Sequence, residues 1–351
     1  MRVLASVRHV RNIQPIEGAD LIVKTQVDGW QCITKKGEFN VGDFGVYFEI
    51  DSFVNASDSR FSFLSKQFMN WEGKFGARIR TIKLKGQIAQ GLMLPISLFG
   101  EIQEPFDGMD VTKLLGVEKW EPPIPAQLAG DVVGGVPTFI RKTDEERIQN
   151  LIDKISTHID EQIFEQTVKL DGTSMTVFYV NKSSNYFTPN NTGVCGRNWQ
   201  LRESVGNSLW HVAKRNNLID ALCNFCEKEG RSLAIQGELI GEGIQGNNEC
   251  LKGQDFYLFK IWDIEQQKFA NNEDFKYVVN ALKDCGATMH CVPSLGKITF
   301  KPGTTVESIL AMADGPSLFA KNREGIVFQR VDGEFSFKAI SNWYLEKNQN
   351  R

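Results

Sequence analysis

The hydrophobic positions of the first 116 residues occur in short runs that are separated by glycine-containing turns. The chain begins with alternating apolar and polar positions, and β-branched and aromatic runs follow at residues 30–34, 45–50 and 77–85. Alternation and short runs of this composition are typical of β-strands. We therefore expect a small β-barrel or sandwich in this part of the chain.

The composition changes between residues 121 and 137. This segment holds four prolines and three glycines: Pro122, Pro123, Pro125, Pro137, Gly130, Gly134 and Gly135. Such a segment is a poor core and is typical of a connector. We place a first domain at residues 1–120, the connector at 121–137 and a second domain at 138–351.

The second domain alternates strand-like runs with a few helical segments. Residues 143–146 have capping-box spacing, which predicts a helix that runs towards Ile155, and residues 204–225 also have a helical pattern. Strand-like runs lie at residues 164–169, 174–180, 232–240, 256–262, 325–329 and 334–340. The predicted fold class is α+β, with a β-rich module followed by a larger module of antiparallel sheets flanked by helices.

Composition and charge narrow the class of protein. The chain has 351 residues, of which 41% are hydrophobic and 24% charged, and these values exclude wholesale disorder. No apolar run approaches the roughly 20 residues of a membrane-spanning helix, so we expect no membrane partner. Forty basic and 43 acidic residues give a net charge of -3. Any contact with nucleic acid must therefore come from a local basic patch.

The cysteine pattern favours free thiols. The seven cysteines are odd in number and scattered, which is unlike a disulfide framework and favours a reducing compartment. The first residues lack the apolar core of a signal peptide, so we expect an intracellular protein, with cytoplasm, nucleus and organelle left open. Cys223 and Cys226 have a metal-site spacing, but no second pair lies at zinc-finger distance. We expect these two cysteines to share a buried helix face, and we reject a zinc site that includes His211.

Charged residues inside apolar runs are the unusual feature of the second domain. Lys169, Glu238, Glu324 and Lys338 each adjoin a stretch where an unpaired charge would be costly. From these four residues alone, a buried structural ion network is the favoured interpretation. The context of Lys169 changes this, because Asp171 and a glycine turn follow it. A partly desolvated lysine can act as a nucleophile, and neighbouring carboxylates can hold a divalent cation.

Six short motifs that contain these residues follow one another in a fixed order. They are Lys169-Leu-Asp-Gly172, Gly196-Arg197-Asn198, Gln236-Gly237-Glu238, Phe256-Tyr-Leu-Phe259, Glu324-Gly325-Ile-Val-Phe328 and Phe335-Ser-Phe-Lys338. The set resembles the motifs of the covalent nucleotidyltransferase superfamily, which contains ATP-dependent DNA and RNA ligases and mRNA capping enzymes. Longer phrases at residues 139–149, 194–199, 251–257 and 337–341 resemble the Naegleria RNA ligase clade. That resemblance implies an N-terminal OB-fold β-barrel followed by a nucleotidyltransferase (adenylyltransferase) domain.

The resemblance also implies a role for each motif residue. Lys169 would attack the α-phosphate of ATP and carry AMP as a lysyl phosphoramidate. Glu238 and Glu324 would orient the ribose, and Lys338 would contact the α-phosphate. The other residues implied at the nucleotide site are Val168, Asp171, Gly172, Arg197 and Phe259. Among these, Phe259 would stack on adenine, while Asp171 and Arg197 would lie near the ribose and the RNA end.

The implied cofactors are ATP, as the AMP donor, and Mg²⁺ or Mn²⁺. Asp171, Glu238 and Glu324 would hold the metal, largely through its waters. The implied substrate is RNA with 3′-hydroxyl and 5′-phosphate ends, to which AMP passes before the ends are joined. We expect a nicked duplex and a monomeric protein, although the sequence leaves open ends as an alternative.

Two positions differ from the residues that relatives often carry, and one basic run is a candidate RNA-contacting surface. Ser336 and Gln329 stand where relatives often carry lysine, which weakens the expected phosphate contacts without removing the nucleophile. The densest basic run of the first domain contains Arg78, Arg80, Lys83 and Lys85. It is either a phosphate-tracking surface or a solvated strand face, and we favour RNA contact.

Two alternative functions stay open at this point. A DNA ligase or a GTP-using capping enzyme would share the motifs, although the N-terminal place of the OB domain argues against both. A non-catalytic OB-fold nucleic-acid-binding protein with an inactive transferase domain is favoured only by Ser336 and Gln329. Such a protein would bind RNA without ever being labelled by ATP.

Overall fold

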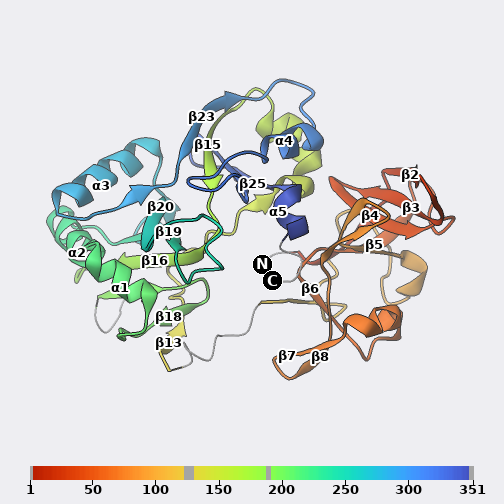
Figure 1. Ribbon diagram of the computed structural model, residues 1–351, viewed down its shortest axis with the longest axis horizontal. Coiled ribbons are helices and arrows are strands. Elements are labelled where there is room, and N and C mark those ends of the chain that lie inside the picture. The colour runs from red at the N-terminus through yellow and green to blue at the C-terminus, as the bar shows by residue number, and fades with distance from the viewer. Residues whose placement is uncertain (1–2, 122–129, 187–190, 348–351) are drawn as a thin grey trace. The chain divides into compact units, whose positions relative to one another are not determined.

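The computed structural model describes residues 3–121, 130–186 and 191–347, and the chain divides into two units (Figure 1). The first unit contains Met1–Pro123, Ile148–Asp153 and Asn342–Arg351, and the second contains Ile124–Arg147 and Lys154–Ser341. Two short segments of the predicted second domain thus belong to the first unit, which the sequence pattern does not indicate. Much of the predicted connector, residues 122–129, lies outside the described residues, and the predicted domain boundaries stay a prediction.

The first unit is a set of small sheets, as the short apolar runs predict. Its strands are β1 (Ala5–His9), β2 (Asn12–Ile16), β3 (Ala19–Val27), β4 (Trp30–Lys35), β5 (Phe44–Phe48), β6 (Ser52–Asn55), β7 (Met69–Trp71), β8 (Lys74–Arg78), β9 (Thr81–Leu84), β10 (Gln87–Gln90), β11 (Leu92–Pro95) and β12 (Glu118–Lys119). They pair in the orders β1-β5-β11, β2-β3-β4, β12-β6-β8-β7 and β10-β9. The 3₁₀ helices η1 (Ser59–Gln67) and η2 (Ile96–Leu98) and the helix α5 (Asn342–Lys347) complete it.

Aromatic packing and one polar contact organise this unit. Phe48 on β5 is buried and contacts Phe61 edge-on, with the ring centroids 5.2 Å apart. Residues 148–153 are joined to this unit by Trp30, whose indole N–H donates to the amide oxygen of Asn150. Asn150 in turn donates to the carboxylate of Glu49 at 2.7 Å. These hydrogen bonds satisfy buried polar groups and anchor residues 148–153.

The predicted strand at residues 77–85 is in fact two strands. β8 ends at Arg78, and β9 begins at Thr81 in a separate ribbon with β10. Ile79 is buried and its N–H donates to the carbonyl of Ser52, so the chain leaves one sheet here and enters another. Composition alone could not locate this break, because no glycine, proline, asparagine or aspartate interrupts residues 77 to 84.

The second unit is built on two sheets. The larger sheet has the order β13-β18-β17-β16-β19-β20-β21, with β22 beside β20, and the smaller has the order β14-β25-β24-β15-β23. The strands are β13 (Val132–Gly135), β14 (Glu146–Arg147), β15 (Ile163–Lys169), β16 (Thr173–Tyr179), β17 (Thr192–Cys195), β18 (Trp199–Leu201), β19 (Leu233–Gly241), β20 (Gln254–Asp263), β21 (Lys268–Phe269), β22 (His290–Cys291), β23 (Ser294–Thr299), β24 (Gly325–Arg330) and β25 (Ser336–Ile340).

Helices cover one face of the larger sheet. They are α1 (Ser208–Arg215), α2 (Leu218–Glu229) and α3 (Asn272–Asp284), and α4 (Val306–Met312) lies beside the smaller sheet (Figure 1). The apolar residues of α1, α2 and α3 share one core with Ile235 and Leu239 of β19. Because successive strand residues point to opposite faces, Glu238 of β19 points away from these helices. The sheet face without helices is therefore the face that carries the charged candidate.

Two predicted helices are wrong in detail. Residues 143–155 do not form one α-helix, because Glu146 and Arg147 pair in parallel with β25 as β14. A 3₁₀ helix, η4 (Ile148–Lys154), and a π-helical turn, η5 (Ile155–Ile159), follow. The predicted helix at 204–225 is split into α1 and α2 at Asn217, whose φ of 53° is left-handed. Asparagine tolerates this conformation, and it redirects the chain.

No helix in the described part of the chain is long and apolar enough to cross a membrane. All seven cysteines are described and carry free thiols. Cys226 of α2 is buried, and Cys223 packs against the same core. The predicted shared helix face is thus confirmed.

Candidate functional site

Lys169 is placed by the pairing of β15 with β24. In this antiparallel register Lys169 is opposite Gly325, so Glu324 lies beside the end of β15. The Lys169 amine donates to the Glu324 carboxylate, with Nζ and Oε2 2.6 Å apart. Glycine is required at 325, because a Cβ there would lie 2.2 Å from the carbonyl oxygen of Ala339. The register therefore brings the first and fifth motifs together.

Glu238 reaches the same site from the larger sheet. The turn after Lys169 packs directly on β19, where a Cβ on Gly172 would lie 2.3 Å from the carbonyl oxygen of Leu239. Beyond the turn, β16 pairs with β19 and sets Ser174 opposite Glu238. The Glu238 carboxylate is close enough to act electrostatically on Lys169. One short turn thus couples the two sheets at the lysine.

The electrostatics of this group are dominated by carboxylates. Burial lowers the pKa of the Lys169 amine, but Glu324, Glu238 and Asp171 outweigh it and raise that pKa above its ordinary value. Burial, reinforced by Glu324 and Asp171, raises the pKa of Glu238 to about 8. The pKa of Glu324 is also raised, chiefly by burial. Three carboxylates therefore share one ammonium, and the site has an excess of negative charge.

This donor set fits a divalent cation. Carboxylate oxygens are the ligands that Mg²⁺ and Mn²⁺ prefer. The charge of a cation would favour the ionised form of the two glutamates, whose pKa values are raised by burial and by neighbouring carboxylates. Within the described residues, however, no cluster of three or more His, Cys, Asp or Glu side chains is close enough to coordinate a metal directly. Asp171, Glu238 and Glu324 are therefore suited to a cation held through its own waters.

Asp171 is held by two residues that sequence reasoning missed. Its backbone N–H donates to Oε1 of Glu249 at 3.1 Å, and its carboxylate accepts a hydrogen bond from the side-chain amide of Asn248. Glu249 is buried, and burial raises the pKa of its carboxyl. Both residues lie in the loop between β19 and β20, 77 and 78 residues from Asp171. No periodicity in that glycine-rich loop marks them.

Two cations lie beside a single carboxylate. Arg197, in the turn between β17 and β18, is 3.5 Å from Oδ1 of Asp144. Lys338 of β25 is 3.4 Å from the same oxygen. The structure thus brings the second and sixth motifs together at Asp144, which precedes β14. A phosphate oxygen could replace this carboxylate oxygen between the two cations.

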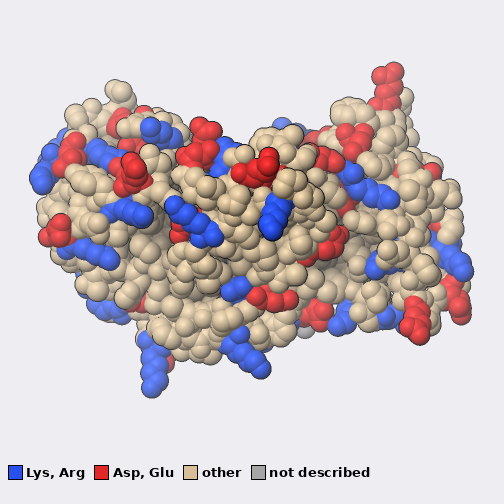
Figure 2. Space-filling view, turned by 90° about the horizontal axis from the view of Figure 1, so that it is seen from above, with Lys and Arg blue, Asp and Glu red and all other residues tan. Residues whose placement is uncertain are grey.

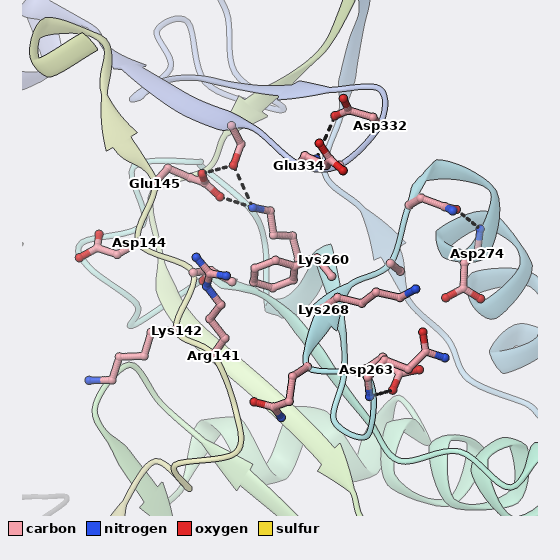
Figure 3. Close-up of a pocket in the computed structure, with 18 of the residues that line it drawn as sticks. Arg141, Lys142, Asp144, Glu145, Lys260, Asp263, Lys268, Asp274, Asp332 and Glu334 are labelled. Carbon is pink, nitrogen blue, oxygen red and sulfur yellow. Dashed lines mark hydrogen bonds and ion pairs between the residues drawn. The ribbon is translucent and has the colours of Figure 1, made fainter. Parts of the chain in front are cut away.

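Ser336 takes part in a buried ion pair. The Lys260 ammonium pairs with the carboxylate of Glu145, and Ser336 donates to the same carboxylate at 2.5 Å. The Lys260 ammonium is also 3.3 Å from the Ser336 hydroxyl. Figure 3 shows Lys260 pointing at Glu145 from the wall of a pocket of about 820 Å³, which Asp144 and Asp332 also line. Ser336 carries no charge where relatives often have lysine, but the ammonium of Lys260 lies next to its hydroxyl.

Phe259 lies at an irregularity in the sheet. Gln236 of β19 pairs with Lys260, but Gly237 pairs with Leu258, so Phe259 is the extra residue of a β-bulge. Bulges redirect a side chain and are common next to active sites. Val168, by contrast, is buried in an apolar cluster with Leu170 and others. The Val168 side chain belongs to that core.

The predicted RNA-contacting residues do not form one surface strand. Arg78 pairs with Asp51 at 2.7 Å and stacks over Trp120, with its guanidinium carbon 3.7 Å from the ring centroid. Lys83 is exposed and pairs with Glu346 at 3.0 Å. The whole set is Arg78 and Arg80, both partly buried, and Lys83 and Lys85, both exposed. Figure 2 shows basic and acidic side chains interspersed on the face that it presents, in agreement with the near-neutral composition.

The site has the features of the covalent nucleotidyltransferase class. It combines a lysine among carboxylates, two cations beside one carboxylate oxygen, and a phenylalanine at a β-bulge. The RNA ligase family model matches residues 162–340, and an OB-fold domain model matches residues 4–96. The chain belongs to the RNA ligase family. No curated protein matches it.

Solved structures of a Naegleria gruberi RNA ligase are similar to the whole chain. A lysine-to-methionine variant with AMP and Mn is 51% identical, with a TM-score of 0.90 and 100% of both chains covered. The ligase with PPi is 51% identical, with a TM-score of 0.89 and 100% of both chains covered. A lysine-to-alanine variant with ATP and Mn is 51% identical, with a TM-score of 0.89, covering 99% of this chain and 100% of that chain.

Proposed function

We propose that the protein is an ATP-dependent RNA ligase that joins 3′-hydroxyl and 5′-phosphate ends through a lysyl-AMP on Lys169. The observation that carries this proposal is the Lys169 amine, which lies 2.6 Å from Glu324 and within the field of Glu238 and Asp171. The likeness to ligase structures that hold ATP, AMP, PPi and Mn supports it over the full length of the chain. Membership of the RNA ligase family argues against a DNA ligase and a capping enzyme.

In the first step the neutral Lys169 amine attacks the α-phosphorus of ATP. An N–P bond forms, the bond between the α-phosphorus and the bridging oxygen breaks, pyrophosphate leaves with the electron pair, and the amine proton passes to solvent. Because the carboxylates raise the pKa of Lys169, the resting amine is protonated and must first lose a proton. Asp171, Glu238 and Glu324 would hold a divalent cation, whose positive charge would lower this pKa.

Other residues bind and orient the nucleotide. Lys338 and Arg197 are placed to neutralise phosphate oxygens, an effect that accounts for most of the catalysis of phosphoryl transfer. Phe259 stacks on adenine, and Gly172 lets the lysine turn lie against β19. In the second step an RNA 5′-phosphate oxygen attacks the lysyl-bound phosphorus, the N–P bond breaks, and Lys169 leaves as an amine that has taken up a proton from solvent. A 3′-hydroxyl then attacks the 5′-phosphorus, its proton passes to solvent, and AMP leaves with the electron pair of the broken P–O bond.

Several finer features belong to the same proposal. The RNA is a nicked duplex, the protein acts as a monomer in a reducing intracellular compartment, and Lys83 and Lys85 contact the RNA backbone. The exposure of both lysines supports the RNA contact, and the free thiols of all seven cysteines support the reducing compartment. Mixtures of nicked-duplex and open-ended RNA substrates, with duplex DNA as a parallel substrate, test the substrate preference directly.

The decisive experiment is covalent labelling. The protein is incubated with ATP labelled at the α-phosphate and Mn²⁺ or Mg²⁺, then denatured and separated on a gel, with Lys169→Ala and a GTP reaction beside it. Label from ATP alone, absent from Lys169→Ala, is the expected result. Folded wild-type protein that is free of prior adenylate and takes no label would sink the ligase proposal in favour of an RNA-binding protein.

A further inference from the structure

Glu249 is a buried carboxylate without a cation among its hydrogen-bonding partners in the described structure. It is 2% exposed, and its two oxygens accept from the backbone N–H of Asp171 and from the hydroxyl of Ser317. Burying a carboxylate is costly unless its oxygens are hydrogen-bonded. A carboxylate retained at such a place, with its bonds directed at a motif residue, points to a role at the lysine turn.

Glu249 and its neighbour hold Asp171 at two points. Glu249 fixes the backbone of Asp171, while Asn248 donates to the Asp171 carboxylate itself. Asp171 is one of the three carboxylates that surround Lys169. With both the main chain and the side chain restrained, the direction of the Asp171 carboxylate is set by the loop between β19 and β20.

The other end of this contact is anchored by hydrogen bonds. Ser317 lies in the segment between α4 and β24, which the buried guanidinium of Arg323 holds by donating to the carbonyls of Met312, Ala313 and Asp314. Hydrogen bonds from a charged group are stronger than those between neutral groups, so the Arg323 guanidinium anchors this segment. Glu249 thus bridges a fixed segment and the Lys169 turn.

We propose that Glu249 is a positioning residue that aims the Asp171 carboxylate at the divalent cation of nucleotidyl transfer, with Asn248 as its partner. This inference rests on the proposed function. Hydrogen bonds that hold a metal-binding carboxylate from behind orient it, and their loss typically costs 10- to 100-fold in metal affinity or activity. Truncating Glu249 should therefore lower the affinity for the metal in a protein that still folds.

The first measurement uses a protein that cannot react. In a Lys169→Met background with saturating AMP, free Mn²⁺ is titrated by its electron paramagnetic resonance signal. We expect Glu249→Ala to weaken Mn²⁺ binding at least fivefold. Glu249→Gln should stay within twofold, because an amide oxygen can still accept from the Asp171 N–H. Glu242→Ala is the matched control, since Glu242 lies in the same loop and is exposed.

The second measurement uses the native Lys169. Glu249→Ala should slow lysyl-AMP formation at least tenfold at low Mn²⁺, with much of the deficit removed at saturating Mn²⁺. A residue that only stabilises the loop would lower thermal stability and leave this metal dependence unchanged. If Glu249→Ala does not fold, Asn248→Ala replaces it, with an expected threefold or greater weakening of Mn²⁺ binding.

Wild-type Mn²⁺ affinity in folded Glu249→Ala, or in Asn248→Ala if the first variant does not fold, overturns the positioning role. Equal loss in Glu249→Gln and Glu249→Ala also overturns it, because a hydrogen-bond acceptor would then be insufficient. Failure of the wild-type protein to take label refutes the proposed function instead. The manganese titration does not depend on labelling, so the two failures are distinguishable.

Discussion

Gly172→Ala tests whether the close approach of the lysine turn to β19 matters for chemistry. A methyl group at this position would lie 2.3 Å from the carbonyl oxygen of Leu239 and 2.7 Å from Cγ2 of Ile240. Neither neighbour is the far end of a flexible side chain, so the turn itself must move. Reaching the 3.0 Å limit of real contacts requires a shift of roughly 0.7 Å, of the size that overpacked sites show.

The expected magnitude follows from that shift. Misplacing a reacting group by about 1 Å can cost 10²-fold in rate, so we expect lysyl-AMP formation to fall between about 10- and 100-fold. Overpacking typically costs about 1–3 kcal/mol, so the free energy of unfolding should fall by that amount. Single-turnover labelling with saturating ATP and Mn²⁺ measures the first quantity, and urea denaturation measures the second.

Gly206→Ala is the matched control, because no atom lies within 4 Å of a Cβ built there and its backbone suits any residue. It should label at the wild-type rate. A folded Gly172→Ala protein that labels within twofold of wild type would refute the reasoning. Loss of stability without loss of rate would refute it as well, because the shift would then spare the lysine.

Three further predictions concern the adenine contact, the acidic group and the buried ion pair. Phe259→Ala should raise the ATP concentration for half-maximal labelling by about 5- to 150-fold, since stacking on a base contributes about 1–3 kcal/mol; an unchanged value would contradict the stacking role. Glu238 has its folded pKa raised to about 8, so the native state binds more protons than the unfolded state above about pH 4.5. Thermal stability of metal-free protein should therefore fall as pH rises from 5 to 8, and Glu238→Gln should flatten this fall; an equal slope in both proteins counts against it. Glu145→Ala strips the nearly buried Lys260 of its partner and should cost about 3–5 kcal/mol in urea denaturation. Glu203→Ala, which breaks an exposed pair, should cost less than about 1 kcal/mol, and equal costs would contradict the argument.

The strands that carry the motifs were predictable because their apolar runs are local features of the sequence. Lys169, Glu238 and Glu324 stand out as charges in those runs, and the structure brings all three together. The helix expected from residue 143 was wrong because pairing with β25, almost 200 residues further on, overrides a local capping pattern. Glu249 could not be found for the same reason, since its contact to Asp171 joins two loops that are 78 residues apart in the sequence.

The charge balance around Lys169 connects these observations to the order of events in the reaction. Burial alone would lower the pKa of the amine and leave it reactive, but three carboxylates reverse that effect and keep it protonated. Those same carboxylates have the donor chemistry for a divalent cation, and burial makes their crowding costly. A divalent cation held by these carboxylates would offset their negative charge and would thereby lower the pKa of the Lys169 amine. Lys169 would then lose its proton more readily, and Asp171, which Asn248 and Glu249 restrain, is one of the carboxylates that would hold the cation.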